Sequence, residues 1–378
     1  MTAADNMAAA RFMKNHANTS SNTFKRVVLL CLFAFFLASA RAFPADDMTS
    51  TIIIGNSRID VVIEKGSLEV SKEELLKWVQ WAGESVSAYY GHFPVPHLLL
   101  RIVPTEGRGV RNGRTFGEKG GFITIHVGSD TIFAGLAADW MLTHEMVHLS
   151  FPSVEDNHHW IEEGIATYVE PIARVRAKHM DAGQMWFELV RDLHQGLPAA
   201  GDKGLDYTHT WGRTYWGGAL FCFLADIEIH QKTANRKGLD DALRGILAAG
   251  GDIRQEWPLE KALDAGDKAI GVSVLRPLYE KMKDQPYDVD LPALWKQLGI
   301  EKEDGKIRFV DGASLSQTRV AITYGSAASA SSAASAMSIV AGDTAMTFPS
   351  KYNLAKPPPS IWSSSRKRRP SLLPALLP

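Results

Sequence analysis

The pentapeptide HEMVH at residues 144–148 and the segment WIEEGIATY at residues 160–168 decide how this sequence folds and what it can bind. Histidines four positions apart lie on one face of an α-helix, so His144 and His148 can reach the same metal ion, with Glu145 beside them. A catalytic zinc ion takes three protein ligands and keeps one open position for water. The short stretch between the two segments favours an antiparallel helix pair, so the second segment can supply the third ligand.

The context supports the pentapeptide, which alone is weak evidence because a chain of this length matches it by chance on the order of a few times in a hundred. Apolar residues recur at helical spacing ahead of it, and Phe151-Pro152 supplies a stop signal behind it. These signals place the motif on a helix of ordinary length.

Several residues compete for the third ligand position. Glu162 and Glu163 are equally acidic, but they point about 100° apart on a helix, so only one can face the metal. His158 and His159 are further candidates, although they fall in the predicted turn, where surface or pocket-rim histidines are the commoner outcome. Spacing alone leaves this choice open.

These residues resemble those of the gluzincin zinc metallopeptidases, whose second helix carries an E-G-x-A-x-Y-like segment with the glutamate as third ligand. The resemblance implies that His144, His148 and Glu163 bind one zinc ion (Zn2+) and that Glu145 is the general base. It also covers TYWGGAL at residues 214–220, which implies that the Tyr215 hydroxyl stabilises the oxyanion. The alternative for Tyr215 is packing in an aromatic cluster with Trp211 and Trp216.

Two departures from the family pattern narrow this expectation. Glu163 follows His148 by 15 positions, a shorter interval than in thermolysin-like and aminopeptidase members, and this favours a divergent bacterial branch. The sequence has no G-x-M-E-N motif, and residues 117–121 occupy a comparable place without it. Aminopeptidase specificity is therefore not implied.

The flanking sequence predicts an α+β fold, with a small N-terminal mixed sheet and a mainly helical C-terminal lobe. Residues 43–130 form the mixed α/β lobe, and residues 131–322 form the helical zinc-binding and C-terminal lobe. In the first lobe we expect strands at 51–54, 59–63, 98–103 and 122–127, a helix at 71–90 opened by a Ser71/Glu74 capping box, and a loop at 106–121. The family resemblance also implies that strand 122–127 is the edge strand that binds a substrate peptide, and the alternative is an ordinary half-buried strand. Further helices are expected at 239–249, 272–282 and 291–298.

The two ends of the chain have distinct compositions. Residues 1–42 are expected to be a signal peptide with an N-terminal extension, because Lys25 and Arg26 precede an apolar run at 27–38 and small residues at 38–42. An uncleaved anchor is the rival interpretation, and both place the protein outside the cytoplasm, secreted or periplasmic. Residues 323–378 are rich in Ser, Ala and Pro and are expected to be a disordered tail.

Composition limits the possible partners. The net charge of -1 and pI of about 6.9 give no electrostatic reason to expect nucleic acid or an anionic membrane, so a membrane contact is expected only through the N-terminal segment. Cys31 lies in the apolar run and leaves Cys222 alone, so no internal disulfide is expected. Arg213 is expected to form a structural ion pair.

The sequence thus predicts zinc-dependent hydrolysis of peptide bonds, with a peptide or protein as substrate. Two alternatives stay open: a catalytically inactive envelope protein that binds zinc or a partner, and a zinc hydrolase of a non-peptide amide or ester. Substrate specificity, exo- or endopeptidase action and oligomeric state are not encoded in these patterns.

Overall fold

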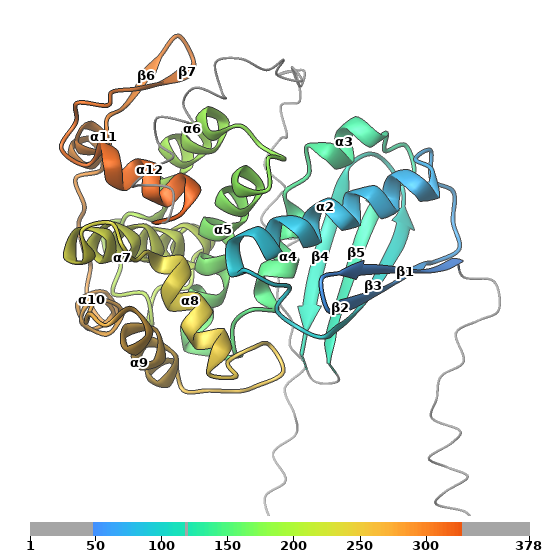
Figure 1. Ribbon diagram of the computed structural model, residues 1–378, viewed down its shortest axis with the longest axis horizontal. Coiled ribbons are helices and arrows are strands. Elements are labelled where there is room, and N and C mark those ends of the chain that lie inside the picture. The colour runs from blue at the N-terminus through green and yellow to red at the C-terminus, as the bar shows by residue number, and fades with distance from the viewer. Residues whose placement is uncertain (1–47, 118–119, 327–378) are drawn as a thin grey trace, which may run out of the picture. The chain divides into compact units, whose positions relative to one another are not determined.

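The computed structural model describes residues 48–117 and 120–326. Within them the protein is a mixed α+β fold with an N-terminal five-stranded mixed sheet and a helical C-terminal part, as expected from the sequence (Figure 1). The predicted signal peptide at 1–42 and the predicted tail from residue 327 onward lie outside the described residues. No helix in the described part of the chain is long and apolar enough to cross a bilayer.

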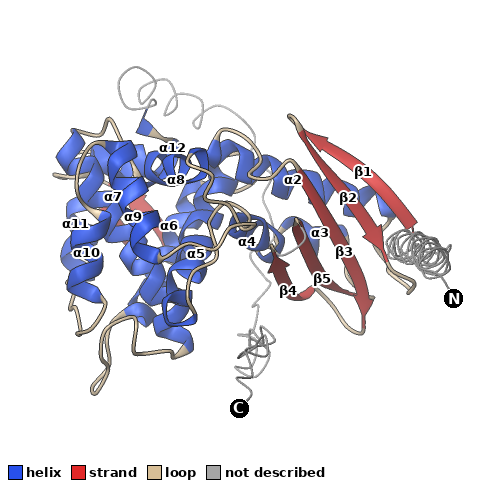
Figure 2. Ribbon diagram, turned by 90° about the horizontal axis from the view of Figure 1, so that it is seen from below, coloured by secondary structure: helices blue, strands red, loops and turns tan. Residues whose placement is uncertain are grey.

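The sheet has the strand order β1-β2-β3-β5-β4. The three central strands run parallel, and β1 and β4 pair antiparallel to their neighbours at the two edges. The strands are β1 (Met48–Ile54), β2 (Ser57–Ile63), β3 (His97–Thr105), β4 (Val110–Phe116) and β5 (Gly121–Gly128). Figure 2 shows β4 on the side of the sheet that lies nearest the helices and β1 on the far side.

One face of the sheet is covered by α2 (Lys72–Tyr90), which begins at the predicted capping box of Ser71 and Glu74. Alternate residues of β3 and β5 are fully buried under this helix, as the period of two in a strand requires. These buried residues are Leu98, Leu100, Ile102, Ile123, Ile125 and Val127. The sheet and α2 together form the base on which α4 (Met141–His148) and α5 (His159–Arg176) pack.

Two expectations for the sheet are wrong. The predicted loop at 106–121 contains β4, and the predicted edge strand at 122–127 lies inside the sheet, as β5, between β3 and β4. The sequence of β4, VRNGRTF, lacks an apolar pattern because an edge strand in this position buries little side-chain surface. Pairing with β5 stabilises the strand, and a local pattern does not reveal that pairing.

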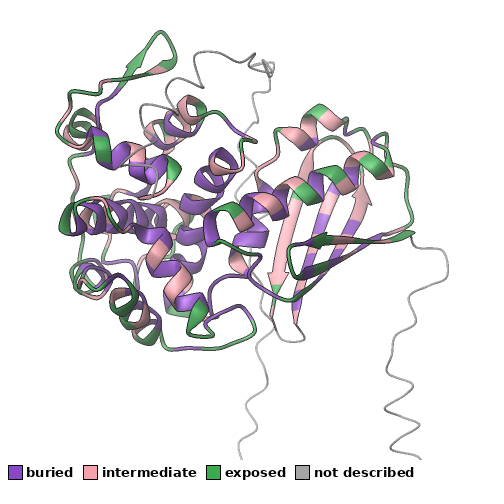
Figure 3. Ribbon diagram, in the orientation of Figure 1, coloured by how far each residue is buried: buried purple, intermediate pink, exposed green. Residues whose placement is uncertain are grey.

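The helical part is built around α5 (His159–Arg176), which packs against α2, α4 and α7 and is buried along most of its length (Figure 3). The helices on the motif side are α3 (Phe133–Ala137), α4 (Met141–His148), η1 (Asp156–His158), α6 (Ala182–Asp192), η2 (Leu193–Gly196) and η3 (Gly212–Gly217). The remaining elements are α7 (Gly218–Thr233), α8 (Leu239–Ala248), α9 (Leu259–Ile270), α10 (Leu275–Met282), α11 (Leu291–Leu298), β6 (Ile300–Glu303), β7 (Lys306–Phe309) and α12 (Ser316–Tyr324).

The last helix ends after the residue at which the tail was predicted to begin. α12 extends to Tyr324, so residues 323 and 324 of the predicted tail are helical. Thr323 is buried, and its hydroxyl accepts a hydrogen bond from Trp186 Nε1 at 3.0 Å. The composition change near this point follows the end of the packed helix by a residue or two.

Helices α5 and α7 cross with their backbones in contact at two glycines. A Cβ atom on Gly164 would lie 2.3 Å from Gly218 Cα, and a Cβ on Gly218 would lie 2.1 Å from the carbonyl oxygen of Trp160. Only glycine permits so close an approach. The crossing therefore brings the segment before Gly218 directly beside the segment that carries Glu163.

Candidate metal centre

The helix that carries the HExxH motif, α4, is anchored at its first turn by Asp139. The Asp139 carboxylate accepts hydrogen bonds from the backbone N–H groups of Met141 and Leu142, both at 3.1 Å. α4 ends at His148, and a short connection containing Pro152 leads back to α5, as expected for the helix pair. The two helices pack against one another and bring their functional residues together.

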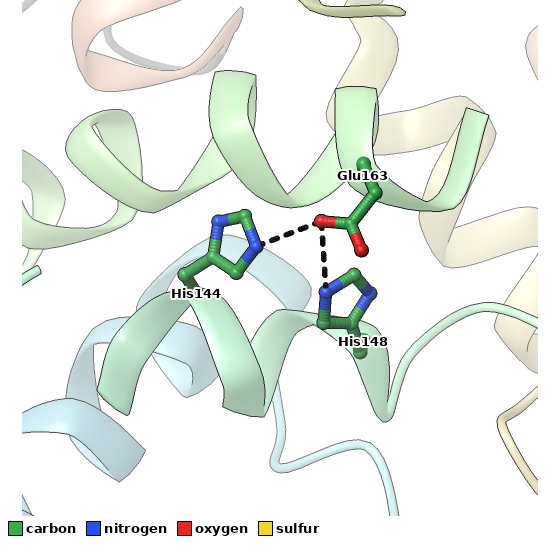
Figure 4. Close-up of side chains that lie close together, drawn as sticks. All are labelled: His144, His148 and Glu163. Carbon is green, nitrogen blue, oxygen red and sulfur yellow. Dashed lines mark hydrogen bonds and ion pairs between the residues drawn. The ribbon is translucent and has the colours of Figure 1, made fainter. Parts of the chain in front are cut away.

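The structure brings together His144, His148 and Glu163. Glu163 Oε2 lies 3.2 Å from His144 Nε2 and 3.6 Å from His148 Nε2 (Figure 4). One ligand atom from each residue falls within 4.8 Å of the other two. Two imidazole nitrogens and one carboxylate oxygen are a donor set that zinc favours, and three protein ligands leave one position open. The residues present therefore fit zinc.

Glu163 and His148 each shift the pKa of the other. Burial alone would raise the pKa of Glu163, but His148 and His144 hold that pKa well below its usual range. Burial alone would lower the pKa of His148, but Glu163 raises it on balance. Opposite charges only a few ångströms apart in a buried site explain both directions.

Glu145 lies next to the cluster and against the edge strand β4. Thr115 Oγ1 is 2.5 Å from Glu145 Oε2 and 2.9 Å from the backbone carbonyl oxygen of Glu145. A Cβ atom on Gly113 would lie 2.6 Å from Glu145 Cγ, so the missing side chain leaves room for the carboxylate. Burial raises the pKa of Glu145, and the nearby imidazoles and Thr115 oppose that increase.

Tyr215 lies on η3, one turn before the glycine crossing. Its ring is 6.3 Å from the ring of His144 and stacks 5.7 Å from that of Trp211. The hydroxyl is hydrogen-bonded to Glu163, and burial followed by the charge of Glu163 raises its pKa well above the usual range. Tyr215 thus belongs to an aromatic row and also places a hydroxyl beside Glu163.

The other candidate ligands point to different partners. Glu162 accepts a hydrogen bond from the Val154 backbone N–H at 3.3 Å, and His158 Nδ1 lies 3.1 Å from Asp206. His159 contacts Glu162 and Glu163 through its two ring nitrogens.

Two further residues singled out in the sequence are buried. Arg213 contacts the Gly196 carbonyl and lies 3.8 Å from Asp202, an ion pair of the expected kind. Cys222 is a free, buried cysteine of α7.

Sequence patterns did not predict Gly113 or Thr115. Both lie in the segment expected to be a loop, and neither belongs to a motif with a fixed spacing from Glu145. The signal that could have identified them is their spacing, because residues two positions apart share one face of a strand, and it becomes meaningful only after β4 is recognised as a strand.

No family model matches the sequence, and no curated protein matches it. The fold is similar to that of an aminopeptidase N family protein from Idiomarina loihiensis, with a TM-score of 0.52 and 11% identity over 68% of this chain and 50% of that chain. Two solved structures of M1 zinc metallopeptidases are more distant in fold. The enzyme from Deinococcus radiodurans has a TM-score of 0.42, 14% identity and coverages of 65% and 52%. A mutant of an M1 zinc metallopeptidase from the same organism, bound to a Tyr-Ser-Ala substrate, has a TM-score of 0.44, 14% identity and coverages of 64% and 53%. The chain spans about half the length of these proteins, and the described residues share a fold with the aminopeptidase N family protein.

Proposed function

We propose that this protein is a zinc-dependent peptidase in which His144, His148 and Glu163 hold one zinc ion and Glu145 is the general base. The observation that carries the proposal is the convergence of two imidazoles and a carboxylate with a separate, buried carboxylate beside them. A purely structural zinc site has no use for Glu145, since this residue is not among the three that could hold the ion.

A zinc ion bound at this site would lower the pKa of a coordinated water to near 7 and polarise the substrate carbonyl. Glu145 takes a proton from the attacking water and passes it to the leaving amine. Burial raises the pKa of Glu145, which makes the carboxylate a stronger base and so assists the first transfer. The Tyr215 hydroxyl donates to the developing oxyanion, for which a placed donor contributes roughly 3 kcal/mol.

The edge strand β4 is the proposed binding element for the substrate. An extended peptide can add its backbone hydrogen bonds to an open sheet edge. β4 meets this requirement, because it is at the edge of the sheet and its Gly113 and Thr115 contact Glu145. A peptide paired with β4 would run past the general base, which favours a peptide or protein substrate over a small amide or ester.

The proposed location is outside the cytoplasm, secreted or periplasmic. The support is the basic and apolar pattern of residues 25–42, which is typical of an export signal.

We likewise propose that residues 43–130 and 131–322 are the two lobes of one catalytic unit and that the C-terminal tail is dispensable for catalysis.

The decisive experiment measures bound zinc and peptide-library cleavage for the wild type and for Glu145→Gln. We expect about one zinc ion per chain in both and cleavage in the wild type alone. Full activity in Glu145→Gln, or a wild type without zinc, overturns the proposal. Glu163→Gln should lose zinc, whereas Glu162→Gln should keep it at saturating zinc. The reverse result would mean that Glu162, and not Glu163, is the third zinc ligand.

A further inference from the structure

His159, the first residue of α5, bridges the two adjacent glutamates of that helix. We infer that His159 is a positioning residue that holds one oxygen of Glu163, so that Glu163 offers only its other oxygen to the metal. This inference rests on the proposed zinc site and adds to Glu163 an outer contact besides the hydrogen bond of the Tyr215 hydroxyl.

The contacts form a continuous chain. His159 Nε2 lies 3.1 Å from Glu163 Oε1, and His159 Nδ1 lies 2.8 Å from Glu162 Oε2. Glu162 is fixed in turn, because its Oε1 accepts from the Val154 backbone N–H at 3.3 Å. The backbone between α4 and α5 thus anchors Glu162, Glu162 anchors His159, and His159 anchors Glu163.

The two oxygens of Glu163 face different histidines. Oε2 faces both His144 and His148, whereas Oε1 is the oxygen held by His159. In Figure 4 both dashed lines end on the same oxygen, and the other oxygen points away from the line to His144. The surrounding histidines therefore give the two oxygens of Glu163 separate roles: Oε2 faces the proposed metal site, and Oε1 contacts His159.

Helix geometry explains why His159 can make both contacts. Glu162 and Glu163 follow it by three and four positions, which are the two spacings that bring side chains together on a helix surface. The neighbouring His158 points elsewhere, to Asp206. The side chain of His159 is 28% exposed, while those of Glu162 and Glu163 are 7% and 9% exposed, so the imidazole closes the cluster at its rim.

The chemical consequence concerns the open coordination position. A carboxylate only accepts hydrogen bonds, so each ring nitrogen of His159 donates to its glutamate. If Oε1 were not held, both oxygens of Glu163 could bind the ion and occupy a further position. Holding Oε1 keeps that position available for water. Loss of a residue that hydrogen-bonds to a metal ligand in this way typically costs about 10- to 100-fold in metal affinity.

Two amide substitutions separate the two contacts of His159. In His159→Gln the side-chain N–H group lies near the place of Nε2 and keeps the contact with Glu163. In His159→Asn it lies near the place of Nδ1 and keeps only the contact with Glu162. His158→Gln is the matched control, since it changes the adjacent imidazole that faces away from the cluster.

The readout is the zinc dissociation constant of each full-length variant, measured by competition with a chromophoric chelator. We expect His159→Asn to bind zinc about 10-fold or more weakly than wild type, and His159→Gln and His158→Gln to stay within about 3-fold. The cobalt-substituted His159→Asn protein should also show weaker visible absorption, because a second bound Glu163 oxygen raises the coordination number.

Equal zinc affinities of His159→Asn and His159→Gln, whether high or low, overturn the inference. That result leaves the proposed function intact if the wild type binds zinc and Glu145→Gln abolishes cleavage. A wild type that binds no zinc overturns both, so the two failures are distinguishable. Circular dichroism of the metal-free variants establishes that the comparison is made between folded proteins.

Discussion

The hydroxyl of Thr115 lies 2.5 Å from Oε2 of Glu145 and joins the edge strand β4 to α4, the helix that carries His144 and His148. The two residues are 30 positions apart in the sequence, so the contact exists only because β4 pairs with β5 beside α4. The strand proposed to receive the substrate is thus also the strand that orients the proposed general base. A change on β4 should therefore alter catalysis without removing the metal.

Thr115→Val tests this connection directly. Because Thr115 lowers the pKa of Glu145, its loss should raise that pKa further and move the acidic limb of kcat/KM to higher pH. Loss of a hydrogen bond to a charged group should also reduce kcat/KM by about 10-fold, with zinc content unchanged. Thr115→Ser should restore the rate, and Thr124→Val on β5 should have no effect. An unchanged pH profile in Thr115→Val would show that Glu145 is held by other groups.

Gly113→Ala tests the space reserved for Glu145. The added Cβ would meet Glu145 Cγ at 2.6 Å and Oε1 at 2.7 Å, so the carboxylate has to move. We expect a loss of turnover of at least about 10-fold, since misplacement of a catalytic group by an ångström is costly. Zinc stoichiometry and the thermal midpoint of the metal-free protein serve as controls. Wild-type turnover in Gly113→Ala would mean that Glu145 does not need this position.

The sequence was sufficient for those parts of the site that depend on local spacing. His144 and His148 face one another because they lie one helical turn apart, and the stop at Pro152 predicted the return of α5. Within the adjacent acidic pair, the choice of Glu163 rested on the family resemblance, and in the structure it is Glu163 that lies with the two histidines.

The contacts that depend on tertiary packing could not be predicted. β4 has no apolar alternation, so its pairing with β5 and its contact with Glu145 are invisible in the sequence. The same holds for His158 and Asp206, which meet across 48 positions. Local patterns predict elements and their faces, while the partners of polar side chains depend on how distant elements dock.

Tyr215→Phe separates the two roles of the tyrosine. If its hydroxyl stabilises the oxyanion, turnover should fall about 100-fold while zinc stays bound. If the ring alone matters, through its contacts with His144 and Trp211, turnover should be unchanged, because phenylalanine preserves the ring. Trp216→Phe, which alters a neighbouring aromatic residue on η3, controls for packing of that segment. Steady-state kinetics on one cleaved peptide, with zinc quantified in parallel, distinguishes these outcomes.

Gly218→Ala should destabilise the protein by roughly 1–3 kcal/mol or more, because the added methyl meets the Trp160 carbonyl oxygen at 2.1 Å. The crossing of α5 and α7 must then widen and move Tyr215 away from Glu163. Gly135→Ala is the control, since its Cβ meets only Thr131 Cγ2 at 3.5 Å. Urea unfolding of both variants measures the difference, and equal midpoints would show that the crossing tolerates a side chain.

Asp206→Asn should reduce stability in a pH-dependent way. Asp206 accepts hydrogen bonds from Trp160 Nε1 and Tyr279 Oη, both at 2.8 Å, and faces His158 Nδ1 at 3.1 Å. Burial alone would raise the pKa of Asp206 and lower that of His158, yet each partner shifts the other in the opposite direction, with Glu260 and Glu155 also raising the pKa of His158. The pair thus connects the start of α5 to α10 through one buried carboxylate.

His158 and Asp206 make contributions to stability that depend on pH in opposite directions. The raised pKa of His158 contributes stability that is complete below its usual value of 6.5 and is lost as pH rises through the folded-state pKa. The lowered pKa of Asp206 contributes stability above its usual value of 3.8, lost as pH falls through the folded-state pKa. At pH 6 the substitution should therefore cost roughly 2–3 kcal/mol. At pH 9 the cost should be smaller by on the order of 1 kcal/mol, since neutral His158 gains less from the charge while Trp160 and Tyr279 still donate. In a His158→Gln background the cost should no longer depend on pH, and a cost that is equal at pH 6 and pH 9 in the parent chain would show that His158 is not charged against Asp206.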